Sequence, residues 1–136
     1  MAQRTGLFVV ALATVLLLDA LWLGLVMRRF YSTRFAPIAR MSGGSMAPIW
    51  PAAALVYVLL AAGLVAFAVP HGAGMASLAA MWGALFGLVI YGFYNLTNHA
   101  TLANWAPMVT VVDIVWGATL CAAVAAVVTI AERWMR

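Results

Sequence analysis

The sequence has no lysine, three acidic residues and one cysteine in a chain of 136 residues. Charged residues make up 7% of it, whereas soluble domains average about 25%. A soluble fold of this length needs far more polar surface than such a composition provides. Disordered chains and nucleic-acid-binding grooves also depend on many charged side chains. The shortage of charge therefore excludes a soluble globular enzyme, a disordered chain and a nucleic-acid partner.

Thiol and imidazole groups are equally scarce. Cys121 has no second cysteine with which to form an internal disulfide, so it does not indicate a redox compartment. His71 and His99 lie 28 positions apart, and no cysteine or acid stands near them at the spacing of metal ligands. The sequence also has no recognisable cofactor motif. We therefore expect neither a metal ion nor a cofactor.

Apolar residues dominate the chain, with 68% hydrophobic residues and a mean hydropathy of +1.09. They form four long stretches, which are residues 7–27, 49–69, 75–95 and 108–130. At ~1.5 Å per residue, each stretch is long enough to cross a hydrocarbon core of ~30 Å as a helix. The first stretch is too long for a signal peptide and no cleavage site follows it. The prediction is an all-α integral membrane four-helix bundle that forms a single domain over residues 1–136.

The longest connection, residues 28–48, combines cationic side chains with aromatic rings. Its arginines are Arg28, Arg29, Arg34 and Arg40, and its rings are Phe30, Tyr31 and Phe35. Guanidinium groups and aromatic rings both favour the headgroup layer of a membrane. We therefore expect an interfacial loop that lies along the membrane surface and contacts membrane lipids.

Four crossings place both termini and the second connection on one side of the membrane. That side carries Arg4, Arg133 and Arg136, and the other side carries the four arginines of residues 28–48. Three arginines against four give almost no positive-inside bias. The prediction is a multi-pass protein with its termini in the cytoplasm, although charge alone leaves its orientation open. An antiparallel homo-oligomer also stays open.

Two acidic residues lie inside the predicted spans. Asp19 is ~12 Å and Asp113 ~8 Å from the membrane face that carries residues 28–48, at ~1.5 Å per helical residue. A carboxylate in lipid costs at least ~2.5 kcal/mol, so both should face the bundle interior and find polar partners. Their similar depth predicts that they share one pocket.

Each acid belongs to the same short pattern, Asp-x-x-Trp followed closely by glycine. Residues three positions apart share a helix face, so Asp19 lies beside Trp22 and Asp113 beside Trp116. Two copies of the pattern in antiparallel helices suggest an inverted internal repeat. Each of these helices therefore presents a carboxyl and an indole to the same pocket.

Polar residues of the third stretch complete that pocket. They recur at intervals of three and four positions, which places them on one helix face. Thr110 lies one turn before Asp113 on the fourth stretch. The predicted ligand-binding residues are Asp19, Trp22, Tyr91, Tyr94, Asn95, Asn98, Thr110, Asp113 and Trp116.

A purely structural role competes with this prediction, because polar residues between membrane helices also hold helices together, at roughly 0.6–2 kcal/mol each. Gly83 and Gly87 form a Gly-xxx-Gly pattern that indicates close helix packing. Trp105 and Trp134 are predicted to be interfacial anchors. Cys121 is predicted to be a small packed residue.

Two segments carry a resemblance to a known family. The longer is Tyr91-Gly-Phe-Tyr94-Asn95-Leu-Thr97-Asn98-His-Ala-Thr101-Leu, followed by Trp105 and Val112-Asp113-Ile-Val-Trp116-Gly117. The shorter is Leu18-Asp19-Ala-Leu-Trp22-Leu-Gly24. Over nearly its whole length the chain resembles the bacterial small membrane proteins grouped as domain of unknown function 2177. The resemblance implies a four-helix protein of the bacterial inner membrane and leaves its chemistry open.

Four functions fit these features. The favoured one is a pocket that binds a small amphipathic or lipid-derived molecule between aromatic walls and a polar end. An intramembrane enzyme acting on a lipid-like substrate would divide acid and base roles between the two carboxyls, although no paired nucleophile and base is recognisable. A small proton-coupled transporter would use a membrane acid, and a structural subunit of a membrane complex would use the cluster only to hold its helices together. Whether the protein is an enzyme is therefore undecided by sequence.

Overall fold

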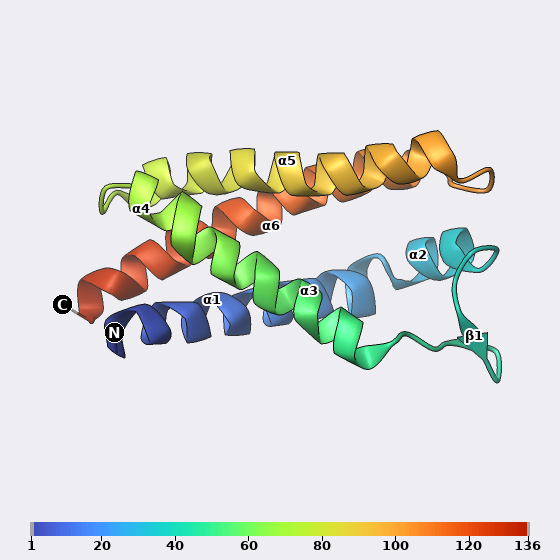
Figure 1. Cartoon of the computed structure of the whole chain (residues 1–136), viewed down its shortest axis with the longest axis horizontal. Helices are drawn as coiled ribbons and strands as arrows, with labels where there is room; N and C mark the ends of the chain where they lie inside the picture. Colours follow the sequence, from blue (N-terminus) through green and yellow to red (C-terminus); the bar gives the residue numbers. More distant parts are fainter. Residues whose placement is uncertain (1, 136) are drawn as a thin grey trace.

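Four long apolar helices run the length of the molecule in the computed structural model, which describes residues 2–135 (Figure 1). The helices that can cross a membrane are Gln3–Val26, Trp50–His71, Ala76–Thr101 and Pro107–Trp134. Each satisfies its own backbone hydrogen bonds, as a chain in lipid requires. The predicted all-α membrane bundle is thus confirmed. Arg136, predicted to add positive charge beside the C-terminus, lies outside the described residues.

Two of the four spans contain a wider, π-helical turn. The first span is α1 (Ala2–Leu21) continued by η1 (Trp22–Val26), and the second is α3 (Trp50–Gly63), η2 (Leu64–Ala68) and α4 (Val69–His71). The backbone N–H of Met27 donates to the carbonyl of Trp22, five residues earlier, over 2.7 Å. Such turns are rare and often lie at functional sites. The turn in the first span begins at Trp22, which belongs to the site described below.

The other two spans are single unbroken helices, α5 (Ala76–Thr101) and α6 (Pro107–Trp134). Pro107 stands at the start of α6, where its missing N–H costs no helical hydrogen bond. The third span runs six residues past its predicted end at residue 95. Its last turns carry exposed polar side chains, so a boundary drawn from hydropathy leaves them out of the helix. The Thr101 hydroxyl, for example, donates to the carbonyl of Thr97 over 2.8 Å.

The connection between the first two spans forms secondary structure of its own. It begins with α2 (Arg28–Phe35) and continues into a hairpin of β1 (Met41–Ser42) and β2 (Ser45–Met46). Gly43 and Gly44 form the tight turn at φ of 57° and 80°, a left-handed backbone that glycine adopts without strain. This connection and the short one between α5 and α6 lie at one end of the molecule, which we call the loop face (Figure 1).

Both termini lie at the opposite end, together with the turn between α4 and α5 (Figure 1). We call this end the terminal face. The side chain of Arg133 donates from Nε to the carbonyl of Gly74 over 3.0 Å, which ties the end of α6 to that turn. Both ends of the described chain thus lie at one end of the bundle, which is the arrangement that four crossings predict.

The helices α5 and α6 pack closely along a seam of glycines. A Cβ atom on Gly83 would lie 2.4 Å from the carbonyl oxygen of Cys121, and one on Gly87 would lie 2.2 Å from that of Gly117. Any larger residue at these positions would force the two helices apart, so the close packing predicted from Gly-xxx-Gly is confirmed. Cys121 itself is fully buried at this seam, as predicted.

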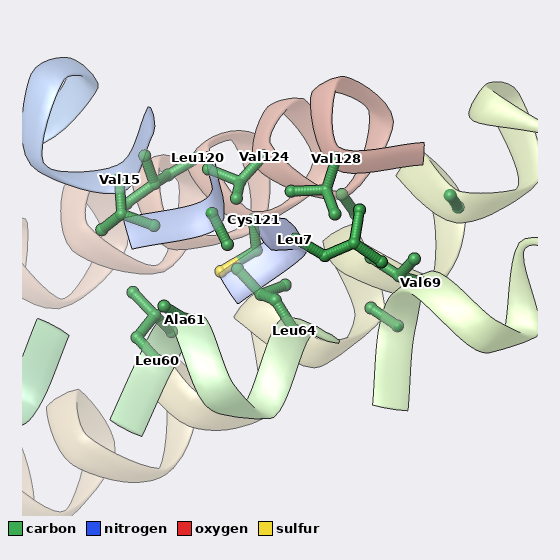
Figure 2. Close-up of a cluster of buried hydrophobic side chains, with 14 residues drawn as sticks. Leu7, Val15, Leu60, Ala61, Leu64, Val69, Leu120, Cys121, Val124 and Val128 are labelled. Atoms are coloured by element: carbon green, nitrogen blue, oxygen red, sulfur yellow. The ribbon is translucent and has the colours of Figure 1, made fainter. Parts of the chain in front are cut away.

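The apolar core joins α1, α6 and the second span (α3, η2 and α4). Figure 2 shows side chains of these elements meeting in one cluster, in which Val15 of α1, Leu64 of η2 and Leu120 of α6 are completely buried. Toward the terminal face, η2 and α4 also contact α5. Toward the loop face α3 runs away from α5 and stays on α1 (Figure 1). The divergence of α3 from α5 opens the space in which the candidate site lies.

Candidate functional site

Asp19 ties three spans together. Its carboxylate accepts a hydrogen bond from the Tyr57 hydroxyl of α3 over 2.6 Å and another from the Trp116 indole N–H of α6 over 2.9 Å. Asp19 itself is on α1, and its side chain is 7% exposed. Both carboxylate oxygens therefore have a hydrogen-bond partner. The side chain faces the bundle interior, as expected because a carboxylate exposed to lipid is costly.

Asp113 on α6 is held by a second pair of neutral donors. The Tyr31 hydroxyl of α2 donates to one of its oxygens over 2.5 Å, and the Asn95 amide of α5 donates to the other over 3.0 Å. The Asn95 amide also donates to the backbone carbonyl of Tyr91 over 3.0 Å, which fixes its orientation. Asp113 thus links α2, in the connection between the first two spans, to both helices of the glycine seam.

The two acids are connected through a pair of tryptophans. Trp22 and Trp116 stack with ring centroids 4.3 Å apart and planes 3° from parallel. The Trp116 N–H reaches Asp19, while the Trp22 N–H reaches the Tyr31 hydroxyl over 3.4 Å. The tryptophan of each Asp-x-x-Trp pattern therefore supports the acid of the other pattern. Trp116 bonds directly to Asp19, and Trp22 reaches Asp113 through Tyr31.

A cavity of about 500 Å³ lies where α3 diverges from α5, on the loop-face side of the bundle. Its walls are apolar except at one end, and they consist of Val56, Leu59, Leu60, Phe86, Ile90, Tyr91, Tyr94 and Asp113. Asp113, Tyr94 and Val56 lie nearest the loop face, six, seven and six residues from the ends of their helices. Phe86 lies deepest, about 22 Å from the end of α5 at ~1.5 Å per residue. The polar residues of the lining, Asp113, Tyr91 and Tyr94, therefore all lie nearer the loop face than Phe86.

The acids have uncharged surroundings. The groups that donate to them are two phenols, one indole and one amide, and neither acid forms an ion pair with any residue between 2 and 135. Asn95 is fully buried, and its Oδ1 atom has no hydrogen-bond partner within that range. The site therefore has more acceptors than donors and no cation to balance the two carboxyls.

Tyr31 is the buried residue of α2. Burial, and then its hydrogen bond to Asp113, raise the pKa of the Tyr31 phenol above its ordinary value of 10.0. Its ring lies edge-on to Phe30, with centroids 5.3 Å apart, and stacks on Phe35 at 5.5 Å. Phe35 in turn approaches the Trp105 ring at 5.7 Å. These rings cover the loop-face end of the acid network.

The structure brings five of the nine predicted ligand-binding residues into the hydrogen-bonded and stacked network: Asp19, Trp22, Asn95, Asp113 and Trp116. Tyr91 and Tyr94 line the cavity. Thr110 is 7% exposed and accepts a hydrogen bond from the Trp105 indole over 3.0 Å, so it supports Trp105 rather than an acid. Asn98 is half-buried and stays outside the network that the described residues form.

Sequence reasoning missed two tyrosines and misplaced one tryptophan. Tyr57 and Tyr31 each donate to an acid, yet Tyr57 received no role and Tyr31 was expected at the membrane interface. The prediction that Trp105 is an interfacial anchor is wrong, because its side chain is only 6% exposed under α2. A donor requirement at each buried acid is the signal that would have pointed to the tyrosines.

A family model described as predicted membrane protein (DUF2177) matches residues 5–130. The chain belongs to this family. The match includes both Asp-x-x-Trp patterns and all nine predicted site residues. No curated protein and no solved structure matches the chain.

Membership in the predicted membrane protein family agrees with the four apolar spans and adds no chemistry to them. Among residues 2–135, no group of three histidine, cysteine or acidic side chains comes together where a metal could bind. What the geometry offers is a cavity with a carboxyl and two phenols at one end and apolar walls beyond them.

Proposed function

We propose that this family member binds a small amphipathic or lipid-derived molecule within the bacterial inner membrane. The observation that carries the proposal is the cavity between α3 and α5, which is apolar in its deep part and polar at Asp113 and Tyr94. Its volume of about 500 Å³ lies within the range of pockets that hold small molecules. An inner-membrane location fits because outer-membrane proteins are β-barrels, whereas these spans are helices.

The polar end of the ligand would lie toward the loop face. Asp113 and Tyr94 stand there, whereas Phe86 and Leu60 form the deeper part of the wall. Ile90, Val56 and Leu59 line the cavity and are 45%, 61% and 62% exposed, so the cavity opens sideways toward the surrounding lipid. An amphipathic molecule would therefore enter from the bilayer with its tail leading toward the bundle centre.

The two acids would have different roles in this proposal. Asp19 is nearly fully buried, has both oxygens paired and does not line the cavity, so its role is to hold α1, α3 and α6 together. Asp113 lines the cavity, and its carboxylate has room for acceptor bonds beyond the two it already makes. Asp113 is therefore the residue that would contact a ligand.

A cavity-filling substitution tests the proposal. Ile90→Trp places a large side chain in the cavity, whereas Val89→Trp adds the same side chain to the neighbouring position, which is 59% exposed and does not line it. Small molecules that copurify with the wild-type protein in native membrane discs would be identified by mass spectrometry. We expect Ile90→Trp to lose a bound molecule that wild type and Val89→Trp retain. Identical bound molecules in all three would refute the proposal.

A further inference from the structure

The charge of the cavity narrows the class of molecule that would bind there. This step rests on the proposed function and concerns the polar end of its ligand. Asp113 is the one ionisable acid or base among the lining residues apart from the phenols of Tyr91 and Tyr94. No arginine or histidine lines the cavity, and the two hydrogen bonds to Asp113 come from the neutral groups of Tyr31 and Asn95.

Neutral donors leave the formal charge of an ionised Asp113 unbalanced. The nearby Asp19 has the same formal charge, and its partners Tyr57 and Trp116 are also neutral. An anionic headgroup placed against Asp113 would be repelled, and the repulsion is stronger in a partly apolar site than in water. A cationic group placed there would be attracted for the same reason.

The hydrogen-bonding groups of the cavity favour a ligand group with several N–H donors. The Asp113 carboxylate lines the cavity and can accept further hydrogen bonds besides those from Tyr31 and Asn95, whereas the unpartnered Oδ1 atom of Asn95 is fully buried and does not line the cavity. A primary ammonium group has three donors and no acceptor, which complements a site with surplus acceptors. The aromatic rings of Tyr91 and Tyr94, which line the cavity nearer to the loop face than Phe86 does, add a favourable environment for a cation.

We infer that the cavity takes a single-chain amphiphile with a primary ammonium head, held between the Asp113 carboxylate and the tyrosine rings, with its alkyl chain against the apolar wall of α3 and α5. A single chain is specified because a cavity of about 500 Å³ is of the size that holds one small molecule. The arginines of α2 do not line it, so they provide no second site for a phosphate inside the cavity.

The test compares three probes with the same alkyl chain, which are dodecylammonium, dodecanol and dodecanoate. Binding to the wild-type protein in phosphatidylcholine nanodiscs would be measured by titration calorimetry, with the heat of empty nanodiscs subtracted. We expect saturable binding of dodecylammonium that is about tenfold or more tighter than that of dodecanoate, with dodecanol between them. Equal affinities, or a preference for dodecanoate, would overturn the inference while leaving the proposed amphiphile site intact. Absence of saturable binding by all three would overturn both.

Two substitutions of Asp113 test whether its charge causes the preference for the ammonium probe. Asp113→Asn should bring the ammonium and carboxylate probes within about twofold of each other, because it removes the attraction and the repulsion together. Asp113→Glu keeps the charge and should retain the wild-type order of affinities. A preference that survives in Asp113→Asn would overturn the inference. Should that variant fail to fold, the wild-type probe series still decides the matter.

Discussion

Trp22 and Trp116 stack face to face with ring centroids 4.3 Å apart, and together they carry the hydrogen bonds that link Asp19 to Asp113 through Tyr31. The stack joins α6 to the π-helical turn that ends the first span. The Trp116 N–H donates to Asp19, and the Trp22 N–H donates to the Tyr31 hydroxyl, which in turn donates to Asp113. The stack is therefore both a packing contact and the centre of the polar network.

Trp116→Phe should destabilise the protein by removing one donor to Asp19. The ring that stacks on Trp22 is largely kept, so the expected loss of ~1–3 kcal/mol in the free energy of unfolding is the cost of a buried acceptor that loses its partner. Unfolding in mixed micelles can be followed through the reactivity of Cys121, which is fully buried in the folded protein. Trp134→Phe is the control, since Trp134 is 87% exposed and its loss should change stability by less than ~0.5 kcal/mol. Equal losses in the two variants would argue against the network.

Tyr57→Phe should cost ~1–3 kcal/mol, because the hydroxyl that it removes donates to the second oxygen of Asp19. The same substitution at Tyr94, which is 55% exposed, should leave the free energy of unfolding nearly unchanged. Chemical unfolding of both variants under identical conditions gives the comparison. If Tyr94→Phe lowered the free energy of unfolding as much as Tyr57→Phe, the hydrogen bond to Asp19 would not be the cause of the loss.

Gly87→Ala should separate α5 from α6. Its Cβ atom would lie 2.2 Å from the carbonyl oxygen of Gly117, which is backbone and cannot turn aside, so we expect a loss of roughly 1–3 kcal/mol. Gly92→Ala is the matched control on the same helix, because its Cβ atom would meet no atom within 4 Å. That variant should be neutral or slightly more stable, since alanine favours a helix over glycine. Thermal unfolding in detergent measures both, and a reversed order would contradict the close seam.

Alkaline pH should weaken the attachment of α2. The pKa of Tyr31 is raised in the folded protein, so between its ordinary value of 10.0 and that higher value the folded state holds a proton that the unfolded state has lost. The stabilisation is therefore fully present below pH 10 and is lost as the pH rises above it. Unfolding free energies measured from pH 8 upward should fall more steeply for wild type than for Tyr31→Phe. Parallel curves would show that this phenol is not responsible.

Thiol labelling should place Met75 and Met135 on one side of the membrane and Ser32 on the other, because the α4–α5 turn and the end of α6 lie at the terminal face and α2 lies at the loop face (Figure 1). Labelling of single cysteines introduced at these positions can be compared with that of the buried Cys121, which should stay unlabelled in the folded protein. A membrane-impermeant reagent added to intact cells distinguishes the two faces. Labelling of Met75→Cys and Met135→Cys from opposite sides would overturn the four-span topology.

The spans could be predicted from sequence because lipid imposes a simple requirement of length and hydropathy. The seam could be predicted as well, since glycines four residues apart in such a helix permit close contact. The π-helical turns at residues 22–26 and 64–68 could not, because the apolar side chains there fit an α-helix equally well. They depend on how the whole bundle packs.

The partners of the acids depended on helix crossings that a single sequence does not contain. Asn95 could be named because it shares a polar face with its neighbours on one helix. Tyr57 is an isolated polar residue in an apolar helix, and its position opposite Asp19 follows from the angle at which α3 crosses α1. Tyr31 stands among arginines, a context typical of the membrane surface, and it is buried because it packs with Trp105 and Val109 and its hydroxyl reaches Asp113.

The divergence of α3 from α5 is confined to the half of the bundle next to the loop face, and α4 and η2 close that gap toward the terminal face. Under the proposed function, a molecule that diffuses sideways into the opening would come from the leaflet next to the loop face. A molecule in the other leaflet would have no equally direct route to Asp113. The orientation of the protein would then determine which of the two monolayers supplies the ligand, and a reversal of its topology would exchange one supply for the other.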